Sequence, residues 1–257
     1  MKHTEQIIVI KLKFYLFSID IAMNAYIIAA GNGNRLSDAG LNTKKPLIRI
    51  GGMPMIERLI EILSRNGFDK FRVMLNEDST DVATLLLSLK INRKLDIDFV
   101  VKSTPSSMHS FYELSRAFRL EPFYMFTVDT IFDESEFRLF THFCSTQTHF
   151  DSVMAVTRHI DDEKPLYVRY SGDSILEFRN DAASDMITSG FYYFAHDQTD
   201  RLRPLIESGK ERLRLFLADY ALSGAKVGLF TFSKTIDLDR IEDIALAEAF
   251  VARCEEN

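Results

Sequence analysis

The sequence has few of the features that mark secreted, zinc-binding and nucleic-acid-binding proteins. Only two of its 257 residues are cysteines, Cys144 and Cys254, and neither lies in a CxxC pair or beside a histidine cluster. We therefore expect no disulfide framework or zinc site, and a reducing, cytoplasmic location. The formal net charge is −6, whereas a general nucleic-acid binder carries a basic surplus or stripe. Nucleic acid is not an expected partner.

Long apolar runs are also missing. Residues 1–22 contain two short apolar stretches, 7–10 and 14–17, with lysines between them. The segment is too short and too charged for a membrane span, and it lacks the core and cleavage site of a signal peptide. We expect no membrane partner. We interpret residues 1–22 as an N-terminal extension or as residues before the true start.

No internal repeat, low-complexity tract or long linker interrupts residues 23–257, which indicates a single domain. In the first half, short apolar segments alternate with helical patterns, which predicts a mostly parallel sheet covered on both faces. The expected strands there are 24–30, 71–75, 97–101 and 123–128, and the expected helices are 54–66, 79–89, 108–118 and 134–144.

The second half predicts a small antiparallel insertion, roughly residues 157–195. The expected strands of the second half are 152–157, 166–170, 174–179, 189–194 and 226–232, with helices at 198–208, 210–222 and 240–254. A Ser-Gly-Asp turn joins the second and third of these strands as a hairpin. The fold class is therefore Rossmann-like α/β, with three layers and a mixed, mostly parallel central sheet.

A glycine-rich loop follows the first expected strand. Residues 25–36 read A-Y-I-I-A-A-G-N-G-N-R-L, and residues 44–47 read K-K-P-L. Glycine lets several backbone N–H groups converge on one anion, while Arg35 and Lys45 add a planar fork and a point charge for phosphate oxygens. Leu36 replaces the third glycine of a dinucleotide fingerprint, and no Walker A loop is present. The glycines alone also fit an ordinary strand-to-helix turn.

Together, the two segments resemble the signature of nucleotidyltransferases that activate sugar phosphates and phospho-alcohols, including the MobA-like NTP transferase domain. The family pattern is roughly L-A-A-G-x-G-(S/T)-R-(L/M), with P-K-P-L about ten residues later. This chain departs from it at Asn34 and Lys44. The resemblance implies a GT-A-like nucleotidyltransferase fold.

It also implies that an NTP lies over the loop, with Arg35 on the triphosphate and Lys45 neutralising charge at the α-phosphate. The residues that would bind the nucleotide here are Ala29, Ala30, Gly31, Asn32, Gly33 and Asn34.

Two aspartates are candidate ligands for Mg²⁺, which prefers oxygen ligands and usually takes one or two carboxylates. Asp129 closes the apolar strand 123–128, where ligand sites of α/β sheets lie, and the family places a metal aspartate there. Residues 235–248 resemble the family's closing motif, I-D-(T/V)-x-E-D-L-x-x-A-E, which makes Asp239 the second ligand. Asp237 is the alternative, because strand pleat would put it on the same face. Either position could instead be a turn or N-cap residue.

The nucleobase and acceptor sites have weaker candidates. Thr104, Ser106 and Ser107 lie in a loop that the family uses against the base, although short hydroxyls before a helix are commonly N-caps. Gly190 resembles a family glycine that lets the acceptor approach closely. Arg179 lies near the place of a family lysine for the acceptor phosphate, and it could equally be an exposed hairpin residue.

These observations predict a Mg²⁺-dependent transferase that moves an NMP from an NTP to a phosphate monoester, such as a sugar 1-phosphate or phosphocholine, and releases pyrophosphate. The alternatives are a GT-A-type glycosyltransferase and a non-catalytic nucleotide-binding module. A glycosyltransferase normally shows Asp-x-Asp after the fourth strand, whereas Asp129 is followed by Thr and Ile. The sequence does not distinguish the NTP, the acceptor or the oligomeric state.

Overall fold

The computed structural model describes residues 23–31, 36, 38, 40–161, 164–181 and 184–255. The extension expected over residues 1–22 lies outside the described residues. So do four predicted nucleotide-loop residues: Asn32, Gly33, Asn34 and Arg35.

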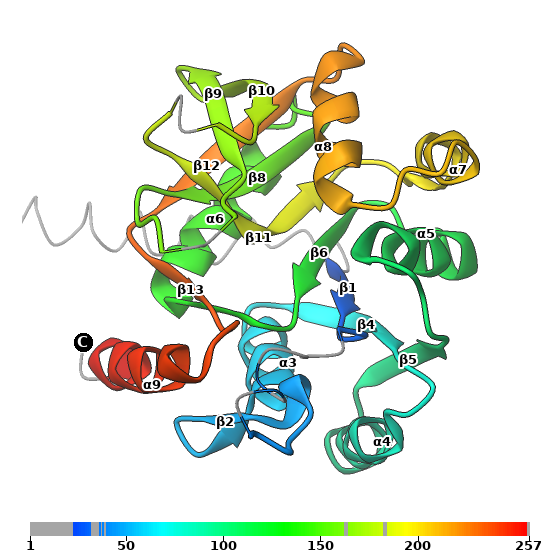
Figure 1. The fold of residues 1–257 in the computed structure, drawn as a ribbon, viewed down its shortest axis with the longest axis vertical. Coiled ribbons are helices and arrows are strands. Elements are labelled where there is room, and N and C mark those ends of the chain that lie inside the picture. Colours follow the sequence, from blue (N-terminus) through cyan, green and yellow to red (C-terminus); the bar gives the residue numbers. More distant parts are fainter. Residues whose placement is uncertain are drawn as a thin grey trace, which may run out of the picture.

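A nine-stranded sheet forms the centre of the molecule (Figure 1). Its strands are β1 (Met23–Ile28), β4 (Phe68–Leu75), β5 (Asp96–Val101), β6 (Phe123–Thr127), β8 (Ser152–Thr157), β9 (Tyr167–Ser171), β10 (Ser174–Arg179), β11 (Ile187–Phe194) and β12 (Val227–Phe232). Their order is β5-β4-β1-β6-β11-β8-β12-β10-β9. The four strands from β5 to β6 are parallel, while β11 runs antiparallel to both of its neighbours β6 and β8. The predicted α/β fold with a mixed sheet is confirmed.

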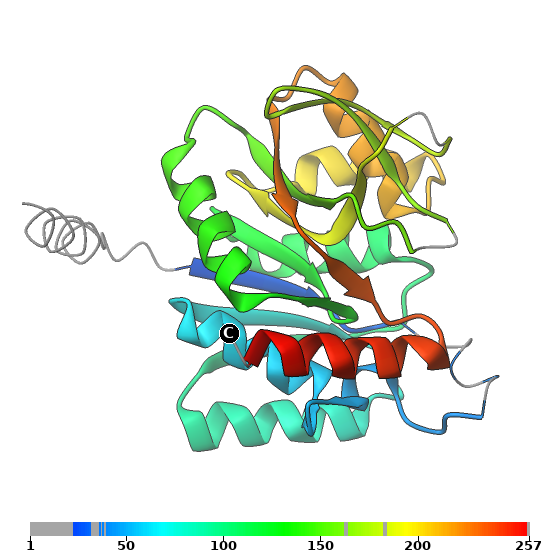
Figure 2. The same cartoon turned by 90° about the vertical axis from the view of Figure 1, so that its left-hand side faces the viewer.

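Helices cover both faces of this sheet, as Figures 1 and 2 show. They are α3 (Met55–Arg65), α4 (Thr80–Arg93), α5 (Ser107–Phe118), α6 (Glu134–Thr146), α7 (Thr199–Glu207), α8 (Leu213–Leu222) and α9 (Ile241–Glu255). Buried side chains of α3, α4 and α6 share one apolar cluster with the sheet. Those of α5, α7 and α8 share a second cluster with it. Two separate clusters, one on each face, make the three-layer arrangement.

A third apolar cluster ties the C-terminal segment to the rest of the fold. Two short strands, β7 (Thr130–Phe132) and β13 (Thr235–Asp237), pair antiparallel, with Asp237 opposite Thr130. Ile131 of β7 and Ile236 of β13 pack with Phe250 of α9. The ladder places residues after β13 beside the loop after β6, and this pairing was not predicted.

The expected elements are present, with ends that shift by a few residues. The predicted hairpin is β9 and β10, and Gly172 in its turn has φ 56°. β4 begins at Phe68, three residues earlier than predicted, because Asp69 and Lys70 interrupt the apolar pattern while β4 still pairs with β1. β9, β10 and β11, which fall in the predicted insertion, are strands of the main sheet.

Short elements that were not predicted lie between the glycine loop and α3. These are a 3₁₀ turn, η1 (Lys45–Leu47), and a two-stranded ladder of β2 (Arg49–Ile50) and β3 (Met53–Pro54). Pro54 closes β3 and precedes α3, rather than opening the helix. Within the described residues, no helix is both long enough and apolar enough to span a membrane.

Candidate active site

The candidate site lies at the carboxyl ends of β1 and β6, where the order in which strands are added to the sheet reverses. β1 and β6 are parallel neighbours, with β4 beside β1 on one side and β11 beside β6 on the other. Chains leaving the carboxyl ends of such a strand pair turn in opposite directions and leave a crevice, where α/β proteins bind ligands. The glycine loop leaves β1 here, and Asp129 follows β6.

Lys45 joins the two predicted metal aspartates. Its Nζ donates to Asp129 Oδ2 at 2.6 Å and to Asp239 Oδ1 at 2.7 Å. Only 9% of the Lys45 side chain is exposed. Burial lowers the pKa of Lys45, but the charges of both carboxylates outweigh it and raise this pKa above its usual value. Burial also opposes ionisation of Asp129, yet Lys45 keeps the Asp129 pKa below its usual value. The lysine and Asp129 are therefore both charged at neutral pH.

Backbone contacts hold Asp239 at this point. Leu238 N–H donates to the Asp129 carbonyl at 3.0 Å. The buried carboxylate of Asp243, in the first turn of α9, accepts from the N–H groups of Asp239 at 2.9 Å and Arg240 at 2.6 Å. A first-turn carboxylate that reaches back in this way satisfies free N–H groups before a helix. The start of α9 therefore fixes the backbone that presents Asp239.

Asp237 has a different environment. Thr130 Oγ1 donates to Asp237 Oδ1 at 2.7 Å. Burial, with the Asp129 charge nearby, raises the pKa of Asp237 to about 7. The expectation that Asp237 and Asp239 share a strand face does not apply, because β13 ends at Asp237 and Asp239 lies beyond it. Of these two, Asp239 is the one that bonds to Lys45.

The fit to Mg²⁺ depends on Asp129 and Asp239. In the part of the chain that the structure describes, no group of three or more His, Cys, Asp or Glu side chains is arranged to hold a metal ion. The two carboxylates do converge, since both contact one cation, Lys45 Nζ. Two carboxylates are what Mg²⁺ takes when phosphates and waters complete its shell. The pair therefore fits an ion that arrives with a nucleotide, and it does not form a closed metal cage.

Gly190 occupies a place that no other residue can enter without displacement. Its φ is +73°, and a Cβ there would lie 2.5 Å from Thr130 Oγ1 and 2.8 Å from Thr127 Oγ1. The pairing of β11 with β8 shifts register between Thr188 and Tyr192, as in a bulge. The glycine lets β11 approach the hydroxyl groups of Thr127 and Thr130, which bond to each other, and Thr130 in turn donates to Asp237.

A cleft of about 440 Å³ opens beside these residues, a size that suits a small-molecule ligand. It combines three aspartates with three cationic side chains. Its lining residues are Ser107, Thr127, Asp129, Lys164, Leu166, Thr188, Gly190, Tyr192, Arg212, Leu213, Arg214, Leu217, Asp237 and Asp239. Four of the predicted site residues therefore line this one cleft: Ser107, Asp129, Gly190 and Asp239.

Other predicted residues have local partners. Ser106 Oγ caps α5, accepting from His109 N–H at 3.5 Å, and it also contacts the Glu211 carbonyl. Thr104 Oγ1 lies 2.7 Å from Ser110 Oγ. Of the three hydroxyl residues proposed for the nucleobase, Ser107 alone lines the cleft.

Arg179 is engaged elsewhere. Its guanidinium donates to both oxygens of Asp181, at 2.7 and 2.8 Å, and it does not line the cleft.

The start of the glycine loop is only partly described. Ala29 N–H donates to the Met74 carbonyl at 3.0 Å, so this amide belongs to the sheet. Ala30 is half-buried and Gly31 is exposed. A Cβ at Gly31 would meet nothing within 4 Å, so open space lies next to this backbone.

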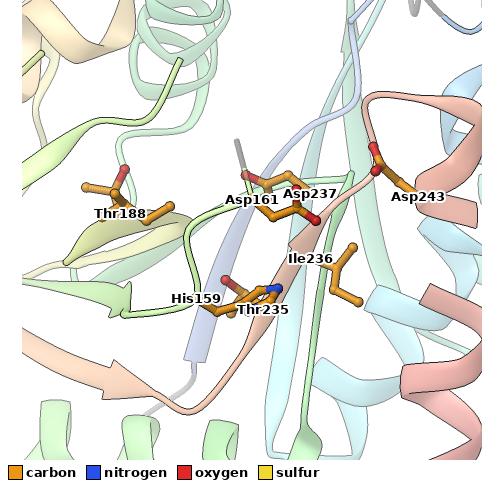
Figure 3. Close-up of a pocket in the computed structure, with 8 residues that line it drawn as sticks. His159, Asp161, Thr188, Thr235, Ile236, Asp237 and Asp243 are labelled. Atoms are coloured by element: carbon orange, nitrogen blue, oxygen red, sulfur yellow. The ribbon is translucent and has the colours of Figure 1, made fainter. Parts of the chain in front are cut away.

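A much smaller polar cavity adjoins the cleft, and Figure 3 shows its side chains. Its volume is about 20 Å³, and its lining residues are His159, Asp161, Ile187, Thr188, Thr235, Ile236, Asp237 and Asp243. This space is close to that of one water molecule. The larger cleft is therefore the candidate substrate site.

The sequence analysis missed the cations of the cleft, Lys164, Arg212 and Arg214. They come from two segments without a glycine loop or a motif that we recognised, so no local pattern singled them out. It also missed Thr127 and Thr130, which look like ordinary strand residues.

Comparison with known proteins places this geometry in context. A curated 2-aminoethylphosphonate cytidylyltransferase of Lancefieldella rimae is 43% identical over 51 residues, which is 20% of this chain and 21% of the relative. The match thus spans about a fifth of the curated relative's length.

Solved structures share the fold over nearly the whole chain. The inositol-1-phosphate CTP transferase from T. maritima aligns with a TM-score of 0.76 and 19% identity, covering 92% of this chain and 97% of that one. A putative glucose-1-phosphate thymidylyltransferase from Bacillus anthracis aligns with a TM-score of 0.77 and 16% identity, covering 89% and 95%. Because the sequence identities are this low, the structural similarity shows only that the fold is shared.

The family itself is shown by a match over most of the chain. The MobA-like NTP transferase domain matches residues 25–197, which include most of β1 and also Lys45, Asp129 and Gly190. This confirms the resemblance that the glycine loop indicated. The chain belongs to the family of MobA-like NTP transferase domains.

Proposed function

We propose that this protein is a cytidylyltransferase that transfers CMP from CTP to the phosphate or phosphonate oxygen of a small acceptor. The observation that carries the proposal is Lys45, held between Asp129 and Asp239 at the cleft. CTP is the first choice of nucleotide because the curated relative is named a cytidylyltransferase. The T. maritima enzyme of the same fold is likewise named a CTP transferase.

In this reaction the acceptor attacks the nucleotide directly, without a covalent enzyme intermediate, and positive charge stabilises the transition state. An acceptor oxygen forms a bond to the α-phosphorus while the bond from that phosphorus to the oxygen bridging the β-phosphate breaks, and pyrophosphate leaves. Lys45 is a fixed cation where charge develops, and such preorganised charge lowers the barrier. Arg35, which we expect on the triphosphate, lies outside the described residues.

Asp129 and Asp239 would hold Mg²⁺ together with the phosphates. The ion would supply charge neutralisation and orient the phosphate oxygens. The carboxylates also keep Lys45 in place, because each accepts one of its N–H bonds. Asp129 and Lys45 come from opposite sides of the β1–β6 crevice, so the site is assembled by the sheet.

A pyrophosphate-release screen tests this function. CTP, UTP, GTP and dTTP are each combined with 2-aminoethylphosphonate, phosphocholine, inositol 1-phosphate and glucose 1-phosphate, with Mg²⁺ or with EDTA. We expect Mg²⁺-dependent pyrophosphate with CTP and one of these acceptors. Release of a nucleoside diphosphate from a nucleotide sugar would instead identify a glycosyltransferase. Nucleotide binding without any product would identify a non-catalytic module.

A further inference from the structure

Two arginines at the start of α8, Arg212 just before the helix and Arg214 in its first turn, line the cleft without a carboxylate partner among the described residues. We propose that Arg212 and Arg214 bind the dianionic phosphonate or phosphate group of the acceptor. This inference rests on the proposed function and assigns the acceptor's anion to one wall of the site. Both arginines line the same cleft as Asp129 and Asp239.

Neutral groups position Arg214. Its Nη1 donates to Asn180 Oδ1 at 3.0 Å, and its Nη2 donates to the Lys164 carbonyl at 2.9 Å. These acceptors carry no formal charge, so the guanidinium is oriented while its positive charge stays available. Leu213, between the two arginines, is buried in the cluster under α8 and anchors this stretch.

The start of α8 lies beside the start of α5. Ser106 Oγ contacts the Glu211 carbonyl, one residue before Arg212. The adjacent Ser107 lines the cleft with both arginines. The arginines therefore share the cleft with Ser107, the one described hydroxyl proposed for the nucleobase that lines it.

Charge pairing distinguishes these arginines from their neighbours. Among the described residues, no carboxylate forms an ion pair with Arg212 or Arg214. By contrast, Arg158 pairs with Asp185 at 2.9 Å, and Arg203 pairs with Asp200 at 3.1 Å. Unneutralised guanidinium groups that face a cavity suit a phosphate-like anion, which they bind through charge-assisted and bidentate hydrogen bonds.

The opposite wall explains why the acceptor needs them. Asp129, Asp237 and Asp239 also line the cleft, and negative charge on this wall, that of Asp129 above all, would repel a dianion that approaches the nucleotide. Two cations offset the two charges of a phosphonate or phosphate monoester. A monoanionic carboxylate or phosphodiester would gain less from the same pair.

The location favours the acceptor over the triphosphate. The triphosphate cations of this family signature belong to the loop after β1, which leads to Lys45 and β2. Figures 1 and 2 show α8 and β2 toward opposite ends of the molecule. Lys45, whose Nζ bonds Asp129 and Asp239, and the two arginines therefore approach these carboxylates from different parts of the fold, as two separate phosphate groups require.

The test compares Arg212→Gln and Arg214→Gln with a matched control, Arg203→Gln, at an exposed position of α7. Pyrophosphate release is measured against CTP and against 2-aminoethylphosphonate, or the acceptor that the wild-type protein prefers. Losing a charge-assisted bond raises the acceptor KM by about 10-fold to 100-fold, while the KM for CTP changes by no more than about twofold. The control keeps both KM values.

Direct binding separates the two possible failures. Titration calorimetry with 2-aminoethylphosphonate on wild-type protein and on the Arg212→Gln, Arg214→Gln double variant needs no turnover. Equal affinity in both, or an unchanged acceptor KM in active variants, overturns the assignment and leaves the proposed function intact. A wild-type protein that binds the probe through these arginines but releases no pyrophosphate overturns the proposed function instead. Arg212→Gln removes no hydrogen bond that the structure shows, so it remains interpretable if Arg214→Gln unfolds the protein.

Discussion

Gly190 offers the sharpest test of the site geometry, through the substitution Gly190→Ala. The new Cβ would lie 2.5 Å from Thr130 Oγ1 and 2.8 Å from Thr127 Oγ1, distances that real Cβ atoms do not tolerate. Both hydroxyls belong to the chain of hydrogen bonds that ends at Asp237. The substitution therefore forces β11, which carries Gly190 at the cleft, away from these hydroxyl groups.

The expected loss of stability has two parts. An alanine at positive φ costs about 1–2 kcal/mol, and steric overlap in a packed site adds about 1–3 kcal/mol. Gly172 isolates the first part, because it also has positive φ (+56°) but its Cβ would meet nothing within 4 Å. We expect Gly190→Ala to lower the free energy of unfolding by about 2–5 kcal/mol, and Gly172→Ala by about 1–2 kcal/mol.

Urea denaturation of the purified variants measures both values by linear extrapolation. A second substitution checks the cause. Thr130→Ala removes the nearer hydroxyl, so it should cost less in the Gly190→Ala background than alone, by about 1 kcal/mol in a double-mutant cycle. Equal losses for Gly190→Ala and Gly172→Ala, with additive effects in the cycle, would refute the overlap and with it the close approach of β11.

Three further predictions address charge, positioning and thiol reactivity. Lys45→Ala should lower turnover about 10²- to 10³-fold in pyrophosphate release, whereas the neighbouring Lys44→Ala should keep nearly normal turnover, and comparable rates in both would contradict the role of Lys45. Asp243→Asn should reduce kcat about tenfold, because it weakens the charged acceptor that holds the Asp239 backbone; a lower melting temperature at full kcat would mean a purely structural role. Burial and the nearby Asp133 raise the pKa of Cys254 to about 11, so its labelling by a disulfide reagent should rise roughly tenfold per pH unit from about pH 7 to about pH 10. A labelling rate that levels off near the ordinary thiol pKa would show that the pKa of Cys254 is not raised.

Local patterns predicted most of the fold. β1, β6 and β8 are short apolar runs, and α3 has an apolar face that ends before Gly67 in a left-handed conformation. These signals lie within about ten residues of one another, so they can be read before any tertiary contact is known. The three-residue strands β7 and β13 gave no such signal, because their pairing depends on α9 packing against them.

The candidate site divides in the same way. The glycine loop, Lys45 and Asp129 stood out because each follows or closes a recognisable strand. The choice between Asp237 and Asp239 could not be made from sequence, since both positions fit the motif. It depends on where β13 ends and on the contact between Asp243 and the Asp239 backbone.

The sequence by itself predicted the α/β class, the glycine loop after β1 and the kind of charge that the candidate site carries. Tertiary structure alone decided which charges meet. Lys45 lies 84 positions from Asp129 and 194 from Asp239, and Arg212 and Arg214 at the start of α8 line the same cleft from yet another segment. Strand order in the sheet brings such distant segments together, and strand order is a property of the whole packed core that no local run of residues encodes.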